Sequence, residues 1–448
     1  MGTGSATTST RSPTCEKPLR RGRALLLAES PLATTLGMTL SGTFLTAMVV
    51  GFEGGVFEVG LATAAGALGA VGMLVSNPLI NRIGSRRRFC LITLGVVRSL
   101  RMVISGLPLL VIVGWAPRSM YWPLVGCVLV SAMFGTAAEI SRRSWISDLV
   151  GPTERGRFFS RRVMLSMLAS IIILPTGGML LDRMPRTGGQ PMTALAVLVG
   201  FGAAVGWVGW LLLYRAPEPP MAPPRRQTGL GQSLILPWLR PRFRPLLAVA
   251  GANALACSLA AGFFDIYMLR HLGLSWKWIA AVNTVGQLAA LAAAPLFGRW
   301  ADHSGARKVL NTSFWCKGIF PALWILVAPA WWQLVFVVVL VRAFNSAGMI
   351  CWARLSMNLS PPRNRAAFLA ASQAIVGAGG AVGALAGGTL VALLDRWDFS
   401  LDLGGFAVVP LHVVFLLSAV MRVTTIPLLR YIREPRHSMV NAPDPDLD

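Results

Sequence analysis

Charged residues are scarce in this sequence of 448 residues. They make up 13% of the chain, whereas soluble globular proteins carry roughly a quarter, and hydrophobic residues reach 54%. So little charge cannot cover a surface that faces water, which excludes a soluble globular protein. Acidic residues are fewer than basic ones: the chain has 18 Asp and Glu and 41 Lys and Arg, which gives a net charge of +23.

Groups that commonly carry chemistry are also few. The six cysteines form no C-x-x-C pair and the four histidines have no ligand spacing, so the sequence predicts neither a disulfide framework nor a metal site. The phosphate-binding pattern G-x-x-x-x-G-K-[ST] is absent, which argues against direct use of ATP. We therefore expect no cofactor and no enzymatic activity.

Long apolar runs dominate what remains. A membrane-spanning helix needs about 20 mostly apolar residues to cross about 30 Å of hydrocarbon. Twelve such runs fit without overlap, which predicts an all-α polytopic membrane protein. The expected spans are Leu32–Phe52, Val56–Leu79, Phe89–Val113, Trp122–Ser141, Val163–Leu181, Thr193–Tyr214, Leu246–Arg270, Trp278–Phe297, Val309–Ala328, Trp331–Ala353, Ala366–Leu394 and Phe406–Leu429.

The basic residues indicate how the chain is oriented. Most of them fall in the two ends and in alternate loops, which the positive-inside rule places in the cytoplasm together with both termini. We therefore expect a multi-pass protein of the inner (cytoplasmic) membrane, whose basic residues contact anionic lipid headgroups and not nucleic acid.

A Pro- and Arg-rich stretch near the midpoint divides the chain. The predicted units are a cytoplasmic tail (1–30), a first six-helix bundle (31–214), a cytoplasmic linker (215–245), a second bundle (246–430) and a second tail (431–448). Across the fourth helix, the loop after it and the fifth helix, the first half matches the second at one constant offset without a gap, which pairs Asp148 with Asn358, Pro152 with Pro362 and Arg155 with Arg365. Two pseudo-symmetric bundles follow from this repeat.

The loop "GRWADHSGARK" gives the sharpest family signal. It resembles the G-x-x-x-D-R-x-G-R-[RK] motif of the major facilitator superfamily at five positions, with His303 in place of the usual Arg. These positions are Gly298, Asp302, Gly305, Arg307 and Lys308. The first-half copy keeps Arg82, Gly84, Arg86 and Arg87 but has Asn81 at the acidic position. The resemblance extends over nearly the whole chain and implies a bacterial transporter of this family.

The resemblance also implies a gate. In the family, the acid of this loop latches the other half of the protein while the cytoplasmic side is closed, which would place Asp302 near Arg157 and Arg161. We expect Gly298 to allow close helix approach and Gly305 to allow a tight turn. The alternative is that these charges only set topology. Because Asn81 cannot carry a charge, the two halves of the gate should be unequal.

Ionisable residues inside membrane helices are costly and therefore mark candidate functional sites. In the family, helices 1, 4, 7 and 10 line the cavity, which favours Glu139, Asp265 and Arg342. Arg342 is the leading candidate to bind a substrate carboxylate or phosphate, with Asn345 on the same helix face. The alternative for Arg342 is a structural ion pair with Asp265. For Glu139 the alternatives are a proton-binding site and an ion pair with Arg98.

Neutral polar residues supply weaker candidates. Thr39 and Thr43 lie along one face of the first helix, and Asn283 and Gln287 are spaced i, i+4 on the eighth. Asn253 in the seventh helix is comparable. The alternative for the threonines is that each hydroxyl binds a carbonyl of its own helix.

These observations predict a monomeric secondary transporter for a small solute. We expect alternating access across the cytoplasmic membrane, coupling to an ion gradient with protons as the first candidate, and efflux as one direction to consider. Two other classes stay open on the same fold: a membrane sensor or scaffold that does not transport, and a lipid-handling membrane protein.

Overall fold

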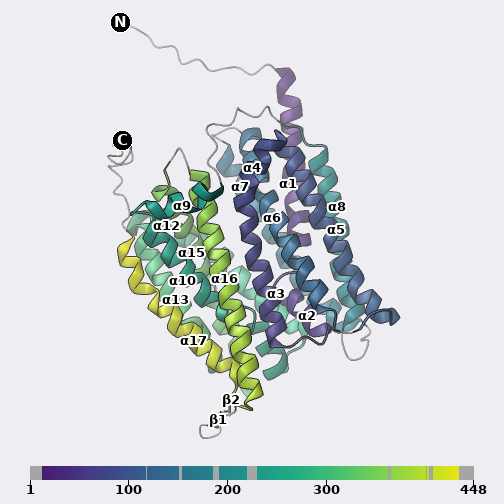
Figure 1. Cartoon of the computed structure of the whole chain (residues 1–448), viewed down its shortest axis with the longest axis vertical. Helices are drawn as coiled ribbons and strands as arrows, with labels where there is room; N and C mark the ends of the chain where they lie inside the picture. The colour runs from purple at the N-terminus through teal and green to yellow at the C-terminus, as the bar shows by residue number, and fades with distance from the viewer. Residues whose placement is uncertain are drawn as a thin grey trace.

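The computed structural model describes residues 13–117, 119–150, 154–184, 191–218, 230–361, 365–399, 401–402 and 407–432. Nearly all of these residues are helical, as Figure 1 shows. The two strands, β1 (Leu401–Asp402) and β2 (Ala407–Val408), are two residues long and pair antiparallel. The predicted all-α architecture is therefore confirmed.

The first half of the chain is helical, and two of its membrane spans consist of more than one helical element. Its elements are α1 (Pro13–Met38), α2 (Thr43–Gly51), α3 (Val56–Leu68), η1 (Gly69–Val71), α4 (Gly72–Ile83), α5 (Arg86–Val113), α6 (Tyr121–Leu149), α7 (Arg155–Arg183) and α8 (Met192–Tyr214). The helix α9 (Leu230–Leu239) lies in the predicted linker.

The second half repeats the pattern. Its elements are α10 (Arg244–Ala261), α11 (Phe264–Ile266), the π-helical η2 (Tyr267–His271), α12 (Trp276–Ser304), α13 (Ala306–Ile325), η3 (Pro329–Trp331), α14 (Leu334–Leu340), α15 (Ala343–Leu359), α16 (Arg365–Arg396), α17 (Pro410–Thr424) and η4 (Ile426–Tyr431). The domain bounds expected from the sequence stay predictions.

Eleven helical stretches among the described residues are long and apolar enough to cross a membrane, against the twelve predicted. The expected ninth span corresponds to α13, which has 20 residues but carries Arg307, Lys308 and Lys317 and is less apolar. The predicted start of the first span at Leu32 is also too late, because the structure places that span at Arg21–Gly51. The cause is Glu29, which interrupts the apolar run in the sequence but lies inside the helix.

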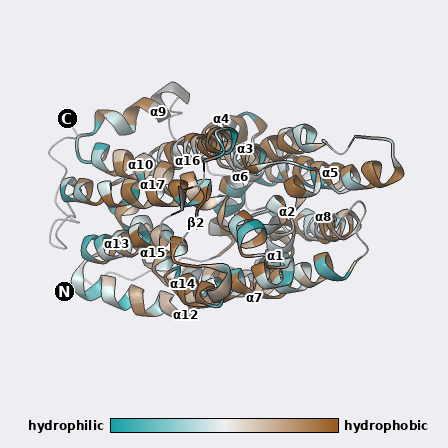
Figure 2. Cartoon of the chain, turned by 90° about the horizontal axis from the view of Figure 1, so that it is seen from below, coloured by the Kyte–Doolittle hydropathy of each residue, from teal (hydrophilic) through white to brown (hydrophobic). Residues whose placement is uncertain are grey.

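The helices form two groups that meet along two seams. In Figure 2 the elements α1–α8 lie on one side and α10–α17 on the other, with α16 beside α3 and α12 beside α7. Large apolar side chains such as Ile92, Leu296 and Val337 are exposed on the outside of the groups. Lipid tails would cover such a surface, as the sequence composition requires.

We name the side on which α1 begins and η4 ends, at the top of Figure 1, the terminal face. The two groups make close contact toward the opposite face. A Cβ at Gly60 of α3 would collide with the Ala384 carbonyl of α16, and one at Gly178 of α7 would collide with Ala280 of α12. Such close approach needs glycine, so the opposite face is closed by tight helix packing.

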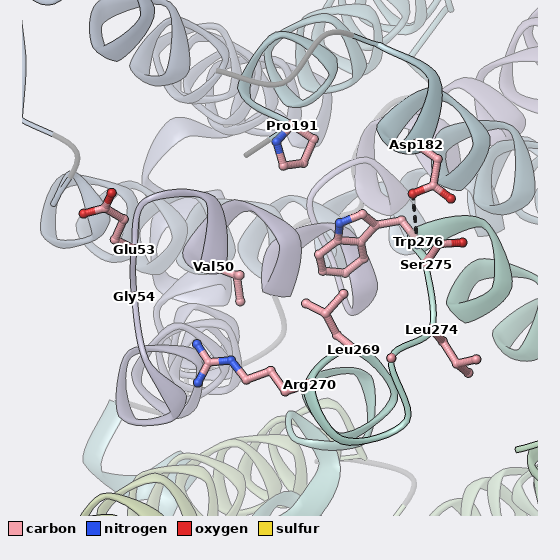
Figure 3. A pocket seen from close by; sticks show the side chains of 11 residues that line it. Val50, Glu53, Gly54, Asp182, Pro191, Leu269, Arg270, Leu274, Ser275 and Trp276 are labelled. Atoms are coloured by element: carbon pink, nitrogen blue, oxygen red, sulfur yellow. Dashed lines mark hydrogen bonds between the residues drawn. The ribbon is translucent and has the colours of Figure 1, made fainter. Parts of the chain in front are cut away.

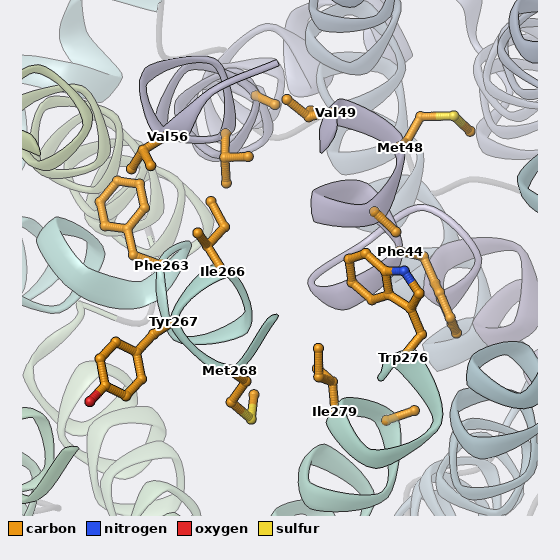
Figure 4. Close-up of a cluster of buried hydrophobic side chains, with 14 of the residues drawn as sticks. Phe44, Met48, Val49, Val56, Phe263, Ile266, Tyr267, Met268, Trp276 and Ile279 are labelled. Atoms are coloured by element: carbon orange, nitrogen blue, oxygen red, sulfur yellow. The ribbon is translucent and has the colours of Figure 1, made fainter. Parts of the chain in front are cut away.

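A hydrophobic cluster reinforces this closure. Figure 4 shows Phe44 and Met48 of α2 facing Trp276 and Ile279 of α12, with Phe263 next to Val56 of α3. All of these side chains are buried. The cluster joins residues from both halves, so opening this face would expose its apolar surface to water.

Candidate functional site

Three helices are interrupted at the same depth between the two halves. The first breaks between α1 and α2 at residues 39–42, where Gly42 has a φ of 51°. The seventh breaks between α10 and α11 and continues as a π-helix, and the tenth breaks between α14 and α15 at Val341 and Arg342. Broken backbone within a membrane is tolerated where it lines a cavity, because polar groups there find other partners.

A cavity of about 330 Å³ lies at these breaks. Its walls come from the first, fifth, seventh, eighth, ninth, tenth and twelfth predicted helices. The polar lining residues are Ser41, Thr43, Cys257, Asp265, Asn283, Gln287, Lys317, Arg342, Asn345 and Arg422. The apolar lining includes Phe264, Phe320 and Trp324. This mixture of apolar walls and a few convergent polar groups is typical of a small-molecule site.

Asn283 of α12 is the centre of a polar network in this cavity. Its side-chain Nδ2 donates to Thr43 Oγ1 at 3.0 Å and to Asp265 Oδ1 at 2.9 Å, and its Oδ1 accepts from Arg342 Nη1 at 2.5 Å. The network therefore joins all three broken helices to α12. The alternative of a direct Arg342–Asp265 pair does not hold in this conformation, because the amide of Asn283 lies between the two side chains.

The other neutral candidates separate into two groups. Gln287 and Asn345 line the cavity, and Gln287 Oε1 accepts from Ser170 of α7 at 2.9 Å. Thr39 donates to the Leu36 carbonyl of its own helix and packs against Gly202 of α8. Asn253 accepts a weak bond from Cys257 and is not part of the cavity wall. The own-helix alternative therefore describes Thr39, whereas Thr43 faces the cavity.

Glu139 lies in an ionic cluster toward the terminal face. It binds Arg142 and Arg143 of its own helix, and Arg142 Nη1 also reaches Glu29 Oε1 at 2.7 Å. The expected pairing of Glu139 with Arg98 is wrong, because Arg98 donates to the carbonyls of Leu94 and Gly206. Arg142 and Arg143 follow Glu139 by about one helical turn, so the local pairs form within α6.

Of this cluster, sequence reasoning identified only Glu139. The sequence places Glu29 in a predicted tail, but its side chain is fully buried in α1, and Arg162 of α7 lies 3.7 Å from its Oε2. The charged side chains of α1, α6 and α7 therefore meet inside the first half. The sequence does contain a signal for Glu29, because it is the only acid in "LLLAESPL". A first helix that starts earlier than predicted would place this acid in the membrane.

The loop between α12 and α13 shows one expected feature and lacks two others. Gly305 has a φ of 85°, which supports the predicted tight turn. Asp302 binds Arg354 of α15 at 2.7 Å and does not pair with Arg157 or Arg161, which are exposed on α7. A Cβ at Gly298 would meet open space, so none of the described helices approaches closely there. The acid is thus held within its own half in this conformation.

In the first-half copy of the loop, between α4 and α5, the carboxylate comes from Glu218 of the linker. Glu218 accepts from Ser85 Oγ at 2.6 Å and from the backbone N–H of Arg87 at 3.0 Å, at the start of α5. Gly84 ends α4 with a φ of 70°, and Arg82 is exposed. The side chain of Asn81 lies outside the described residues. A carboxylate at a helix N-terminus is favourable, so Glu218 fixes the linker to this loop.

The two sides of the cavity differ in how they are covered. The helix face that carries Arg342 and Asn345 continues with Met349, which is 74% exposed. On the opposite side, Asp182 of α7 accepts the backbone N–H groups of Trp276 at 3.2 Å and Lys277 at 3.0 Å. Figure 3 shows Asp182 beside a separate cavity of about 620 Å³ on that side, with Glu53 and Arg270 on its walls. Asp182 therefore caps α12 across the junction of the halves.

Two helical bundles that meet around a polar cavity at the depth of three broken helices form the architecture of a membrane solute transporter. The chain belongs to the major facilitator superfamily, whose family model matches residues 27–290 and 246–446. The resemblance read from the loop motif is thereby confirmed at the level of the family.

The individual relatives share little sequence identity with this chain. The human protein "Solute carrier family 67 member A1" is 31% identical over 182 residues, and the matched part spans 40% of each chain. Among solved structures, the nucleoside transporter NupG has a TM-score of 0.67 at 12% identity, covering 92% of this chain and 100% of that one. A D-xylose-proton symporter has a TM-score of 0.63 at 14% identity, covering 92% and 99%. At such identities these structural likenesses establish the fold alone.

Proposed function

We propose that the chain is a secondary active transporter that moves a small solute across the cytoplasmic membrane by alternating access, with protons as the coupling ion. In this proposal residues 31–214 and 246–430 move as two bodies, joined by the linker 215–245, in a monomer. The solute binds between them, at the network of Thr43, Asp265, Asn283 and Arg342.

One observation carries the proposal: the polar network lies where three helices break, in a cavity between the two bundles, with buried apolar side chains on its opposite side. The terminal side of α15 is exposed at Met349, whereas Phe44, Trp276 and their neighbours fill the opposite side. A site with access from one side at a time is the requirement of alternating access. A rigid scaffold has no need for such a site.

Proton coupling is supported by the cluster of Glu29, Glu139, Arg142 and Arg162. Its carboxylates lie at the junction of α1, α6 and α7, and two of these helices, α1 and α7, also contribute apolar side chains to the cavity wall. A buried carboxylate that exchanges partners between two conformations changes its affinity for a proton. The cluster is therefore the first candidate for the coupling site.

The test uses purified full-length chain in proteoliposomes with a pH-sensitive dye trapped inside. We expect at least one class of small solute to move, to carry protons with it, and to lose most of its flux in Arg342→Gln. Arg396→Gln is the matched control, because Arg396 is exposed at the end of α16. Liposomes of opposite pH gradient distinguish export from import. A solute that stabilises the purified protein but never crosses the bilayer would contradict the proposal and favour a sensor.

A further inference from the structure

Two further cationic side chains, Lys317 and Arg422, line the cavity besides Arg342. Lys317 of α13 and Arg422 of α17 lie side by side, since Arg422 Nη1 donates to the Lys317 carbonyl at 3.0 Å. Arg422 Nη2 donates to the Cys257 carbonyl at 3.1 Å, and its buried Nε has no hydrogen-bond partner among the described residues. Both carbonyls are neutral, so the positive charge of Arg422 is not balanced by them.

Lys317 is equally without an anion. Its ammonium group lies beside Gly348 of α15, where a Cβ would collide with Nζ, and 6.0 Å from the centroid of the Phe314 ring. Within the described part of the chain, Nζ has no carboxylate and no hydrogen-bond acceptor. An ammonium inside a membrane protein without an acceptor is costly, so a binding partner from outside the chain would stabilise it.

The sequence supplies no carboxylate to neutralise this pair. Between Leu246 and Leu394 the only acidic residues are Asp265 and Asp302. Asp265 binds Asn283, and Asp302 binds Arg354 at the rim. The cavity residues from the first half carry no negative charge. The described cavity wall therefore holds three cations, Lys317, Arg342 and Arg422, against one anion, Asp265.

An aromatic surface lies next to the cationic pair. Phe264 is the centre of this surface: its ring centroid is 5.3 Å from that of Phe320, 5.0 Å from that of Trp324 and 4.8 Å from that of Phe415. Phe264, Phe320 and Trp324 all line the cavity. These rings offer an apolar contact surface within the same 330 Å³ space, which limits the ligand to the size of a small metabolite.

We propose that Lys317 and Arg422 form an anion-binding subsite, and that the solute is a small organic anion whose apolar body packs on Phe264, Phe320 and Trp324. This inference rests on the proposed function, because it names the class of solute for the same cavity. The carboxylate, phosphate or sulfonate of the ligand supplies the missing negative charge. The network around Asn283 then holds the polar end of the ligand that faces Arg342.

The probes for the test are 2-naphthoate and its neutral counterpart 2-naphthamide, which differ in charge and hardly in size. Their dissociation constants are measured by titration calorimetry on the purified full-length chain in detergent. We expect 2-naphthoate to bind at least about tenfold more tightly than 2-naphthamide, since a charge-assisted contact is about twice as strong as a neutral one. Inorganic phosphate, tested separately as a competitor, shows whether a free anion occupies the same subsite.

Three variants locate the subsite. Lys317→Gln should remove most of the preference for 2-naphthoate, and Lys317→Arg should restore it because the charge returns. Lys277→Gln is the matched control, because Lys277 is exposed at the start of α12 and outside the cavity wall. Retained binding of 2-naphthamide in every variant shows that the protein is folded.

Each outcome bears on a different claim. Equal affinity for the two probes, or an unchanged preference in Lys317→Gln, would overturn the anion subsite. Competition by phosphate alone, without any preference for the naphthoate, would reduce the subsite to one for inorganic anions and overturn the organic-anion class. If the naphthoate preference depends on Lys317 while no solute crosses liposomes, the subsite stands and the transporter proposal fails.

Discussion

Arg142 of α6 binds Glu29 of α1 through one nitrogen that lies 2.7 Å and 3.0 Å from the two carboxylate oxygens. Glu29 has no exposed surface, and the Arg142 side chain is 14% exposed. This pair joins α1 to α6 within the first half. It also gives the first helix, which is broken next to the cavity, a fixed point on the terminal side of the break.

Loss of the Glu29 charge should destabilise the protein. In Glu29→Gln, Arg142 keeps a buried charge with one partner fewer, and breaking such a buried pair typically costs about 3–5 kcal/mol. We expect a clearly lower unfolding temperature in detergent and reduced transport. The control is Glu154→Gln. The Glu154 side chain pairs with Arg23 but is 61% exposed, so losing this pair should lower the free energy of unfolding by less than about 1 kcal/mol. Equal stability of the two variants would contradict a structural role for Glu29.

Asp182 should hold the opposite face closed. Asp182→Asn removes the negative charge at the N-terminus of α12 while retaining its size, so the closed state loses a favourable contact. A cysteine at Ser41, which lines the cavity, reports opening through labelling by an impermeant maleimide added on the opposite side, in a chain whose native cysteines are replaced. We expect faster labelling in Asp182→Asn than in the parent.

The control for Asp182 is Asp398→Asn, another carboxylate, exposed beyond the end of α16 on the opposite face. Asp398 has a φ of 48°, which asparagine adopts readily, so the backbone should be undisturbed. Labelling rates that do not differ between the two variants would show that the cap of α12 is not part of the gate.

The two copies of the loop motif should contribute unequally to transport. Asp302→Asn should lower uptake into proteoliposomes far more than Asn81→Ala if, as the loop motif predicts, Asp302 carries the charge that latches the terminal face. In the present conformation the partner of Asp302 is Arg354. Small and equal effects of both changes would mean that the loop charges serve only to orient the chain in the membrane.

Asn283 should be required for solute binding. Asn283→Ala removes the amide that links Thr43, Asp265 and Arg342, and leaves each of these three polar groups with one partner fewer. We expect a large rise in KM or a loss of measurable uptake. Asn253→Ala is the matched control, since Asn253 lies on α10 away from the cavity wall. Uptake that falls equally in both variants would place the site elsewhere.

Much of the fold was predictable because it follows from local composition. Apolar runs of about 20 residues must be helical in lipid, where each backbone group needs a partner within its own segment. The number of spans was one higher than the eleven found by length and hydropathy, because α13 is polar enough to resemble a surface helix. The start of the first helix was misplaced because Glu29 reads as a boundary unless its partner Arg142 is known.

The candidate site was predictable only in part. Arg342, Asp265, Asn283, Gln287 and Thr43 all follow from the cost or the spacing of polar groups in a membrane, and the structure brings them to one cavity. Lys317 follows from the same cost of a charge in a membrane helix, but the family resemblance makes the ninth helix peripheral and so ranks it low. Arg422, near the end of the twelfth helix, was not predicted. Their position depends on how α13 and α17 pack against α10 and α15, which no local pattern specifies.

The sequence by itself determined that the chain crosses the membrane many times, that it consists of two related halves, and that its second half contains more cations than acids. These properties depend on composition and spacing, which are local. Only the tertiary structure decided which charges meet: Glu29 with Arg142, Asp302 with Arg354, Asn283 between Asp265 and Arg342. It also decided where helices break, because a break becomes stable only when neighbouring helices satisfy the freed polar groups.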